Sequence, residues 1–164
     1  MPSRRNILLT SFAALAAAVG WRSATDAAAP AKVFEITKTA DEWQKQLTPE
    51  QFYVLRKHGT ERAGSSPLDK VYAAGQYNCA GCDLPLFASE TKYDSTTGWP
   101  SFWKPLDNAV GMSTDRSFGS VRTEIHCRRC GGHLGHVFPD GPKPTGQRYC
   151  MNGVALKFVA KTQS

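Results

Sequence analysis

The pattern of apolar and polar positions divides the chain into a helical part and a β part, which meet near residue 71. In the first part, Thr39 is followed three residues later by Glu42, and Thr48 by Gln51. Each pair fits the capping box, in which the two side chains satisfy the first backbone N–H groups of a helix. The sequence therefore predicts two short helices that begin directly after these threonines.

From residue 71 onward, short apolar or aromatic runs are interrupted by Gly, Pro, Asn and Asp. This texture is typical of small antiparallel strands joined by tight loops. A segment with three aromatics around a proline, residues 98–103, is predicted to be a loop, because proline is excluded from regular central strands. The predicted strands are 71–77, 85–87, 117–126, 133–138, 148–151 and 154–159.

Two histidines are interpreted without a role in chemistry. His58 stands at the predicted end of the second helix, before the expected stop at Gly59, and suits a surface position beside the carbonyl end of the helix dipole. His126 precedes a cysteine with metal-ligand spacing and is interpreted as structural.

The amino terminus has the features of an export signal. Arg4 and Arg5 precede an apolar run over residues 7–20, and small residues follow through positions 27–31. The pattern predicts a twin-arginine signal peptide over residues 1–31, a periplasmic or otherwise exported protein, and one domain over residues 32–164. The run is shorter than the about 20 residues of a membrane span, so none is expected in the mature form; an uncleaved anchor or a disordered basic tail are the alternatives.

The net charge of the chain is +6, and it is smaller when the residues of the predicted signal peptide are left out. The first 29 residues hold Arg4, Arg5 and Arg22 against Asp26, which leaves 17 basic and 13 acidic side chains, or +4. A charge of this size is typical of a solvated surface, and we expect no nucleic-acid partner.

Four of the five cysteines form two Cys-x-x-Cys pairs, Cys79 with Cys82 and Cys127 with Cys130, separated by 44 residues. Two such pairs predict a tetrahedral Cys₄ zinc site. Four protein ligands leave zinc no open position, so its role is expected to be structural. Disulfides, or one pair acting in redox chemistry, are the alternatives in an exported protein.

The fifth cysteine, Cys150, could be a reactive thiol, an intermolecular bridge or a buried structural residue. Arg148 and Asn152 lie two residues to either side and would share its face in a strand, as a cation and an amide donor beside the sulfur. His133 and His136 could add imidazoles to the same pocket. The pattern indicates a thiol enzyme but does not choose among carbonyls, disulfides, peroxides and sulfoxides as its target.

The aromatic segment narrows the choice slightly, because Trp99, Phe102 and Trp103 would suit a small apolar group such as a methyl on sulfur. Together with the two Cys-x-x-Cys pairs, the blocks Gly-Trp-Pro-Ser-Phe (98–102), Gly-His-Leu-Gly-His-Val-Phe (132–138) and Arg-Tyr-Cys-Met-Asn (148–152) occur in an order that resembles methionine sulfoxide reductases of the B type. The resemblance covers about residues 39–158.

This resemblance implies an all-β architecture of two small antiparallel sheets, with the N-terminal helices packed outside. It also implies that Cys150 attacks the sulfur of the R epimer of methionine sulfoxide in proteins or peptides, leaving a cysteine sulfenic acid. The implied supporting residues are His133, His136 and Asn152 at the sulfoxide oxygen, Trp99 and Phe102 at the substrate, and Arg148 beside the thiolate.

One position departs from the family. Many members have a resolving cysteine where this chain has Thr97, so we expect reduction by an external thiol or a thioredoxin-like partner. Two other functions remain open from the residues alone: an exported zinc-knuckle binding module in which Cys150 is incidental, and a thiol peroxidase.

Overall fold

The structure is a computed structural model that describes residues 33–162. The predicted signal peptide, residues 1–31, lies outside the described residues. None of the helices between residues 33 and 162 combines the length and the apolarity that crossing a bilayer requires.

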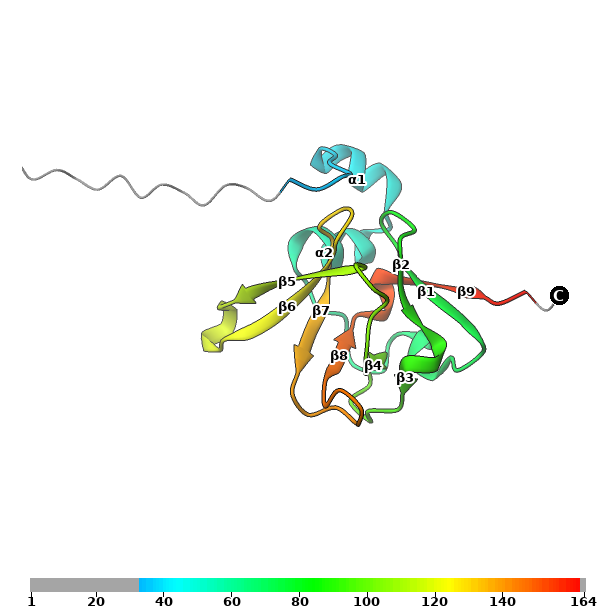
Figure 1. Ribbon diagram of the computed structural model, residues 1–164. Coiled ribbons are helices and arrows are strands. Elements are labelled where there is room, and N and C mark those ends of the chain that lie inside the picture. Colours follow the sequence, from blue (N-terminus) through cyan, green and yellow to red (C-terminus); the bar gives the residue numbers. More distant parts are fainter. Residues whose placement is uncertain (1–32, 163–164) are drawn as a thin grey trace, which may run out of the picture. The chain divides into compact units, whose positions relative to one another are not determined.

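Two α-helices and a 3₁₀ helix come first in the described part of the chain, and short strands with three further 3₁₀ helices between them follow (Figure 1). The α-helices are α1 (Ala40–Gln46) and α2 (Pro49–Lys57). The 3₁₀ helices are η1 (Pro67–Lys70), η2 (Ser89–Thr91), η3 (Ser117–Gly119) and η4 (Gly153–Ala155). The strands are β1 (Gly75–Cys79), β2 (Pro85–Ala88), β3 (Lys92–Tyr93), β4 (Ser101–Phe102), β5 (Val110–Asp115), β6 (Arg122–Cys127), β7 (His133–Phe138), β8 (Arg148–Met151) and β9 (Leu156–Ala160).

Both predicted helices begin where their caps place them. In α2 the Thr48 hydroxyl accepts a hydrogen bond from the Gln51 N–H (3.2 Å), and the Gln51 side chain accepts one from the Thr48 N–H (3.1 Å). The predicted stop at Gly59 is displaced by one residue, because α2 ends at Lys57 and His58 itself takes the left-handed conformation (φ 55°).

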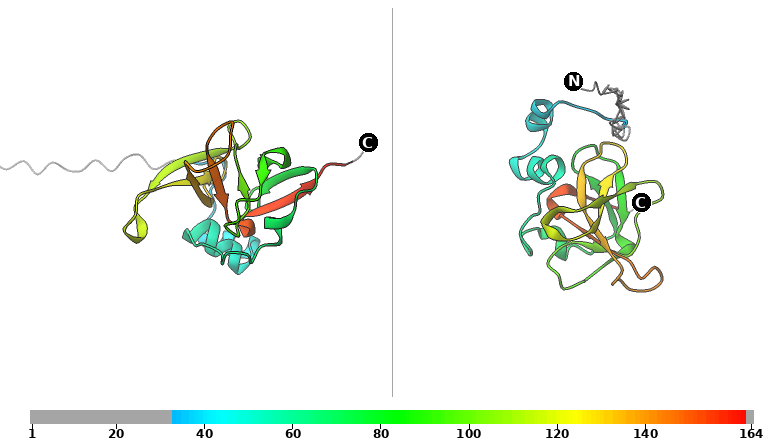
Figure 2. Two further views of the ribbon diagram at one scale, coloured as in Figure 1. Left: turned by 90° about the horizontal axis from the view of Figure 1, so that it is seen from below. Right: turned by 90° about the vertical axis from the view of Figure 1, so that its left-hand side faces the viewer.

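The strands form two antiparallel sheets, which confirms the mainly β fold predicted for the chain. One sheet has the order β2-β1-β9, and the other has the order β3-β4-β8-β7-β6-β5. The helices lie to one side of the sheets, as Figure 2 shows, with α2 against β7 and η4.

Some strand predictions are confirmed and others are wrong. The ranges 133–138 and 148–151 are β7 and β8, and β2 is one residue longer than predicted. The range 117–126 is wrong in its first half, because η3 and the left-handed Gly119 (φ 70°) form the turn before β6. The strands predicted at 71–77 and 154–159 begin later, as β1 and β9, and β3 and β5 were missed.

The segment 98–103 is only partly a loop. Ser101–Phe102 forms β4, an interior strand between β3 and β8, and Pro100 precedes it and still accepts a hydrogen bond from Met151 N–H at 2.9 Å. Proline is tolerated here because it stands just before the strand.

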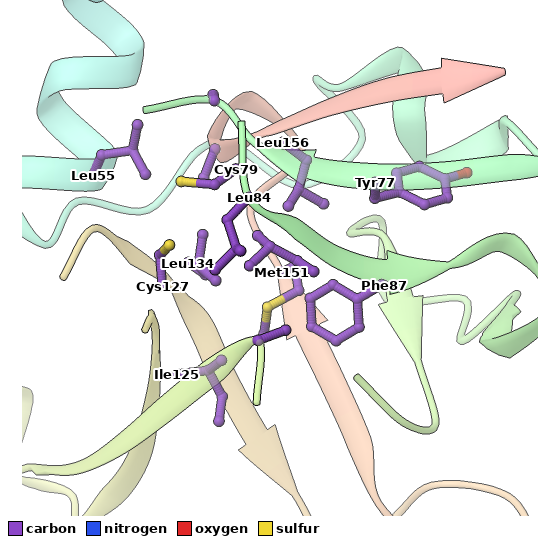
Figure 3. Packing of buried hydrophobic residues seen from close by; sticks show 14 of the residues in the cluster. Leu55, Tyr77, Cys79, Leu84, Phe87, Ile125, Cys127, Leu134, Met151 and Leu156 are labelled. Carbon is purple, nitrogen blue, oxygen red and sulfur yellow. The ribbon is translucent and has the colours of Figure 1, made fainter. Parts of the chain in front are cut away.

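Phe102 is a core residue, so its predicted contact with substrate is corrected. Its side chain is 0% exposed and stacks on Phe87 with ring centroids 4.4 Å apart, while Tyr77 meets it edge-on at 5.0 Å. Met151 and Leu134 belong to the same buried cluster, in which Phe87, Met151 and Leu134 face one another (Figure 3).

Candidate active site

Two matched turns bring four cysteine sulfurs together. The first turn follows β1, and the second joins β6 to β7. Each is closed by a 2.9 Å hydrogen bond to the carbonyl of its first cysteine, from Asp83 N–H to Cys79 and from Gly131 N–H to Cys127. Asp83 and Gly131 are both left-handed (φ 58° and 68°), which points the following chain away from the sulfurs.

The cysteine cluster has the dimensions of a tetrahedral metal site. Its four sulfur atoms all lie within 4.8 Å of one another; Cys79 is 3.7 Å from Cys130, and Cys82 is 3.5 Å from Cys127. A tetrahedron with metal–sulfur bonds of about 2.3 Å separates its sulfurs by about 3.8 Å. All four are free thiols, so the predicted alternative of disulfides is absent from the described residues. The cluster could hold a metal ion with no ligand position left for substrate.

The electrostatics of the cluster favour deprotonated sulfur at two positions. Hydrogen bonds from Cys127, and secondarily from Cys79, hold the pKa values of Cys82 and Cys130 below the ordinary thiol range. Thiolate is the form that binds metal.

Cys150 lines a separate small cavity of about 120 Å³. Of the residues predicted to act at the site, the cavity brings together Cys150, Trp99, His136 and Asn152. His133 lies next to His136, with ring centroids 5.3 Å apart, and Arg148 lies beside Cys150 in β8. The other residues that line the cavity are Thr60, Arg122, Gly135, Phe138 and Met151.

Register places Cys150 between two neighbouring strands. It lies opposite Ser101 of β4 on one side and opposite His136 of β7 on the other. Thr97 Oγ1 is 4.0 Å from its sulfur, and Ser95 Oγ joins the hydroxyls of Thr97 (2.8 Å) and Ser101 (2.7 Å). A second thiol next to Cys150 could occupy the position of Thr97. In this chain that position carries a hydroxyl group, which is linked through Ser95 to the hydroxyl of Ser101.

Burial raises the pKa of the Cys150 thiol above its ordinary value, although Arg148, Thr97 and Ser101 oppose the rise. The resting form is therefore the thiol, and the cation at Arg148 only partly favours the thiolate. Arg148 is held by two hydrogen bonds to Asp140 (2.9 and 2.8 Å) and stacks over the Phe138 ring.

Each active-site histidine is anchored by a carboxylate that the sequence did not reveal. His133 Nδ1 lies 2.8 Å from Glu124 Oε1, and His136 Nε2 lies 2.8 Å from Asp115 Oδ2. Hydrogen bonds from the Ser117 hydroxyl and backbone and from His136 lower the pKa of Asp115. The charged carboxylates fix the orientation of both rings.

Glu124 is ionised in spite of its environment. Burial alone would raise its pKa, but hydrogen bonds from His133, His58 and Ser113 hold the pKa well below the usual range. Burial also lowers the pKa of His136, against the effect of Asp115, so this ring is neutral at rest. The one signal that could have drawn attention to Glu124 is its position, an acid inside the strand predicted over residues 117–126.

Glu61 is a third residue that sequence reasoning missed, and it contacts two residues that line the cavity, Trp99 and Asn152. Its backbone N–H donates to Asn152 Oδ1 (2.9 Å), and its carbonyl accepts from Trp99 Nε1 (3.2 Å). Its carboxylate accepts from the backbone N–H groups of Gly153 (2.5 Å) and Val154 (2.9 Å). The Asn152 amide nitrogen also donates to Leu134 O (3.0 Å), so both the oxygen and the nitrogen of this amide are held by the framework.

A larger cavity of about 590 Å³ lies between α2, η1, η4 and β9. No cysteine or histidine lines it. The groups capable of chemistry therefore meet at the smaller cavity.

The fold is mainly β and carries a four-cysteine cluster, and a half-buried thiol lies near two histidines that carboxylates anchor. These features define a candidate thiol oxidoreductase. The chain matches the SelR domain over residues 47–160, and it belongs to this family of MsrB-type proteins. The protein named Peptide methionine sulfoxide reductase MsrB of Agrobacterium fabrum is 53% identical over 125 residues, which cover 76% of this chain and 93% of the relative.

Proteins of the same name from two other bacteria are similarly close. The relative from Leptospira interrogans is 53% identical over 76% of this chain and 96% of its own length. The relative from Pseudomonas syringae is 52% identical over 78% of this chain and 98% of its own length. The match thus spans the cysteine cluster and the cavity together.

The hydrogen bonds that Glu61 makes to Trp99, Asn152, Gly153 and Val154, here called the Glu61 clamp, predict a selective effect on substrate binding. We expect Glu61→Gln to loosen Trp99 and Asn152, because an amide replaces the carboxylate that accepts from two backbone N–H groups. KM for the substrate should rise about 3- to 10-fold while kcat changes less. Steady-state kinetics would measure both, with the exposed Glu50→Gln as the control; an unchanged KM together with an unchanged unfolding midpoint would contradict the clamp.

Proposed function

We propose that this protein reduces the R epimer of methionine sulfoxide in proteins or peptides to methionine, with Cys150 as the nucleophile. The observation that carries the proposal is the thiol of Cys150 in a small cavity with Trp99 and His136, in a chain about half identical to proteins named peptide methionine sulfoxide reductase. Free methionine sulfoxide is a weaker candidate, because a cavity of about 120 Å³ admits only the end of a side chain.

In the proposed reaction, Cys150 Sγ attacks the sulfur of the sulfoxide. The thiol proton passes to the sulfoxide oxygen, and the resulting hydroxyl moves from the substrate sulfur to Cys150 Sγ as the transient sulfur–sulfur bond breaks. Methionine leaves, and Cys150 holds a sulfenic acid. An external thiol then displaces water to form a mixed disulfide, and a second thiol restores Cys150. Low-molecular-weight thiols or a thioredoxin-like protein would supply these electrons.

The surrounding residues divide the remaining tasks. His133 and His136 carry the proton between the thiol and the sulfoxide oxygen, and their carboxylate partners stabilise the charged imidazoles. Trp99 contacts the terminal methyl of the substrate, an apolar group that suits an aromatic face. Asn152 fixes the loop that carries Glu61, with one amide hydrogen left for the substrate.

The metal in the cysteine cluster is proposed to be zinc. Four thiolates at tetrahedral spacing suit zinc, and an ion with four protein ligands stabilises the fold without touching substrate. We expect one zinc ion per chain.

Export by the twin-arginine route is proposed for the full chain, with cleavage between residues 27 and 31 and a single domain over residues 32–164. A route that carries folded cargo would let zinc bind before the thiols meet an oxidising compartment. Replacing Arg4 and Arg5 by lysine keeps the charge and should leave unprocessed protein in the cytoplasm, seen by fractionation and intact mass. Unchanged export of this variant would contradict the route.

Replacing the nucleophile separates catalysis from the metal site. Cys150→Ser should lower reduction of a peptide R-sulfoxide by at least about 10³-fold, because serine cannot supply the thiolate. Its zinc content and unfolding midpoint should stay close to those of the unaltered protein. Cys82→Ser, the matched control, should lose zinc and stability.

Two results would contradict this assignment. Retained activity in Cys150→Ser would favour a binding module in which the cysteine is incidental. Consumption of hydrogen peroxide by the unaltered protein, with no methionine formed from sulfoxide, would favour a thiol peroxidase.

The position of Thr97 predicts how the cycle ends. After one turnover without reductant, the unaltered protein should hold a sulfenic acid at Cys150 and no internal disulfide. Thr97→Cys should instead form a disulfide with Cys150, because the Thr97 side chain already lies 4.0 Å from the sulfur. Peptide mass mapping would detect both products, with Thr97→Ser as the control; an internal disulfide in the unaltered protein would refute direct reduction by an external thiol.

A further inference from the structure

His58 is an exposed residue at the end of α2, as the sequence predicted, but it also contacts the carboxylate that anchors His133. Its left-handed backbone carries the ring toward β6, where Nδ1 lies 2.9 Å from Glu124 Oε1. The same oxygen is 2.8 Å from His133 Nδ1, and the two imidazole centroids are 5.2 Å apart. The His58 side chain is 63% exposed, whereas that of His133 is 2% exposed.

The oxygen Glu124 Oε1, which both histidines contact, determines which ring nitrogens of His58 and His133 carry protons. An ionised carboxylate can only accept hydrogen bonds, so both Nδ1 atoms donate to Glu124. In its neutral form His133 therefore carries no proton on Nε2. This nitrogen is buried and has no hydrogen-bond partner among residues 33–162. Its lone pair is an acceptor without a partner in this part of the chain, on a ring adjacent to His136, which lines the cavity.

We propose that His58 is a positioning residue for His133: through Glu124 it orients the buried imidazole and sets how strongly that imidazole holds a proton. The expected effect of His58 on turnover rests on the proposed sulfoxide reduction. The geometry of the two histidines on one carboxylate oxygen stands independently of the substrate.

The coupling follows from one negative charge shared by two rings. When His58 is protonated, it already neutralises Glu124, so a proton on His133 Nε2 is less well stabilised. When His58 is neutral, the whole carboxylate charge supports the His133 imidazolium. The hydrogen bond to Glu124 raises the pKa of His58 above its usual value, so the protonated form of His58 persists to higher pH than that of an isolated histidine.

Other charges act on the pair from every neighbouring element. Arg56 on α2 opposes protonation of His58, and Asp115 on β5 favours it. His136 on β7 faces His133 and disfavours a second positive charge there. These groups are the same in every variant proposed below, so differences among the variants report on His58.

The three side chains His58, Glu124 and His133 also lie close enough together to be considered for a metal ion. Ligand atoms 2.8 and 2.9 Å apart would require angles of about 85° at an ion bound at about 2.1 Å, far from tetrahedral. The hydrogen-bonded arrangement, with both imidazoles donating to one oxygen, accounts for the observed distances directly.

Two variants of His58 test the proposal without endangering the fold. His58→Gly removes the side chain but suits the left-handed position at the helix end. His58→Gln can still donate to Glu124 but does not titrate. Lys57→Gln is the matched control, because it removes a positive charge from the adjacent exposed position, away from Glu124.

The first measurement needs no substrate. The chain has four histidines, so the ¹⁵N signals of His133 can be assigned by comparing variants. The midpoint of His133 protonation should rise by about half a pH unit or more in both His58 variants, because the competing cation is gone. It should not move in Lys57→Gln. An unchanged midpoint in His58→Gly would overturn the proposal.

The second measurement is the pH profile of turnover with a peptide R-sulfoxide. His58→Gly should lower kcat about three- to tenfold near neutral pH, with KM within about twofold. His58→Gln should retain more of kcat but lose the ionisation of His58 from the profile. A purely structural His58 would lower only the unfolding midpoint, which would overturn the proposal. An inactive unaltered protein whose His133 midpoint still responds to His58 would instead refute the proposed function alone.

Discussion

The convergence of four cysteine sulfurs is the constraint on which the rest of the structure depends. Cys79 and Cys82 lie in the turn after β1, and Cys127 and Cys130 lie in the turn between β6 and β7, so the cluster joins one sheet to the other. Glu124 and His133 each stand three residues from a cysteine, on the two strands that leave the second turn. Fixing that turn fixes the strand register that brings this carboxylate to the imidazole.

Residues 126–152 therefore contribute to two separate sites. Cys127 and Cys130 belong to the cysteine cluster, whereas His136 and Cys150 line the small cavity from adjacent strands. The cavity is completed from outside the stretch, by Trp99 and by the loop that Glu61 holds. Burial raises the pKa of the Cys150 thiol and keeps it protonated at rest. The thiol proton therefore needs an acceptor, which the nearby imidazoles can provide and the arginine cation at position 148 cannot.

Features that depend only on residues close together in the sequence could be predicted. They include the capping box at Thr48, the strands β7 and β8, and the spacing of the cysteines. These local patterns were enough to locate the reactive region in advance. Contacts between strands could not be predicted: the pairing of Glu124 with both His58 and His133 depends on register and on a left-handed helix end. Phe102 was misassigned for the same reason, because aromatic composition does not tell a core face from a cavity wall.

Single turnover on separated sulfoxide epimers tests the central claim most directly. The protein would be mixed with an excess of a peptide carrying either R- or S-methionine sulfoxide, without reductant, and the methionine and the oxidised cysteine would be quantified by mass spectrometry. The account predicts one methionine per chain from the R epimer, an equal amount of sulfenic acid at Cys150, and no product from the S epimer. Methionine formed from the S epimer, or oxidation confined to the cluster cysteines, would contradict it.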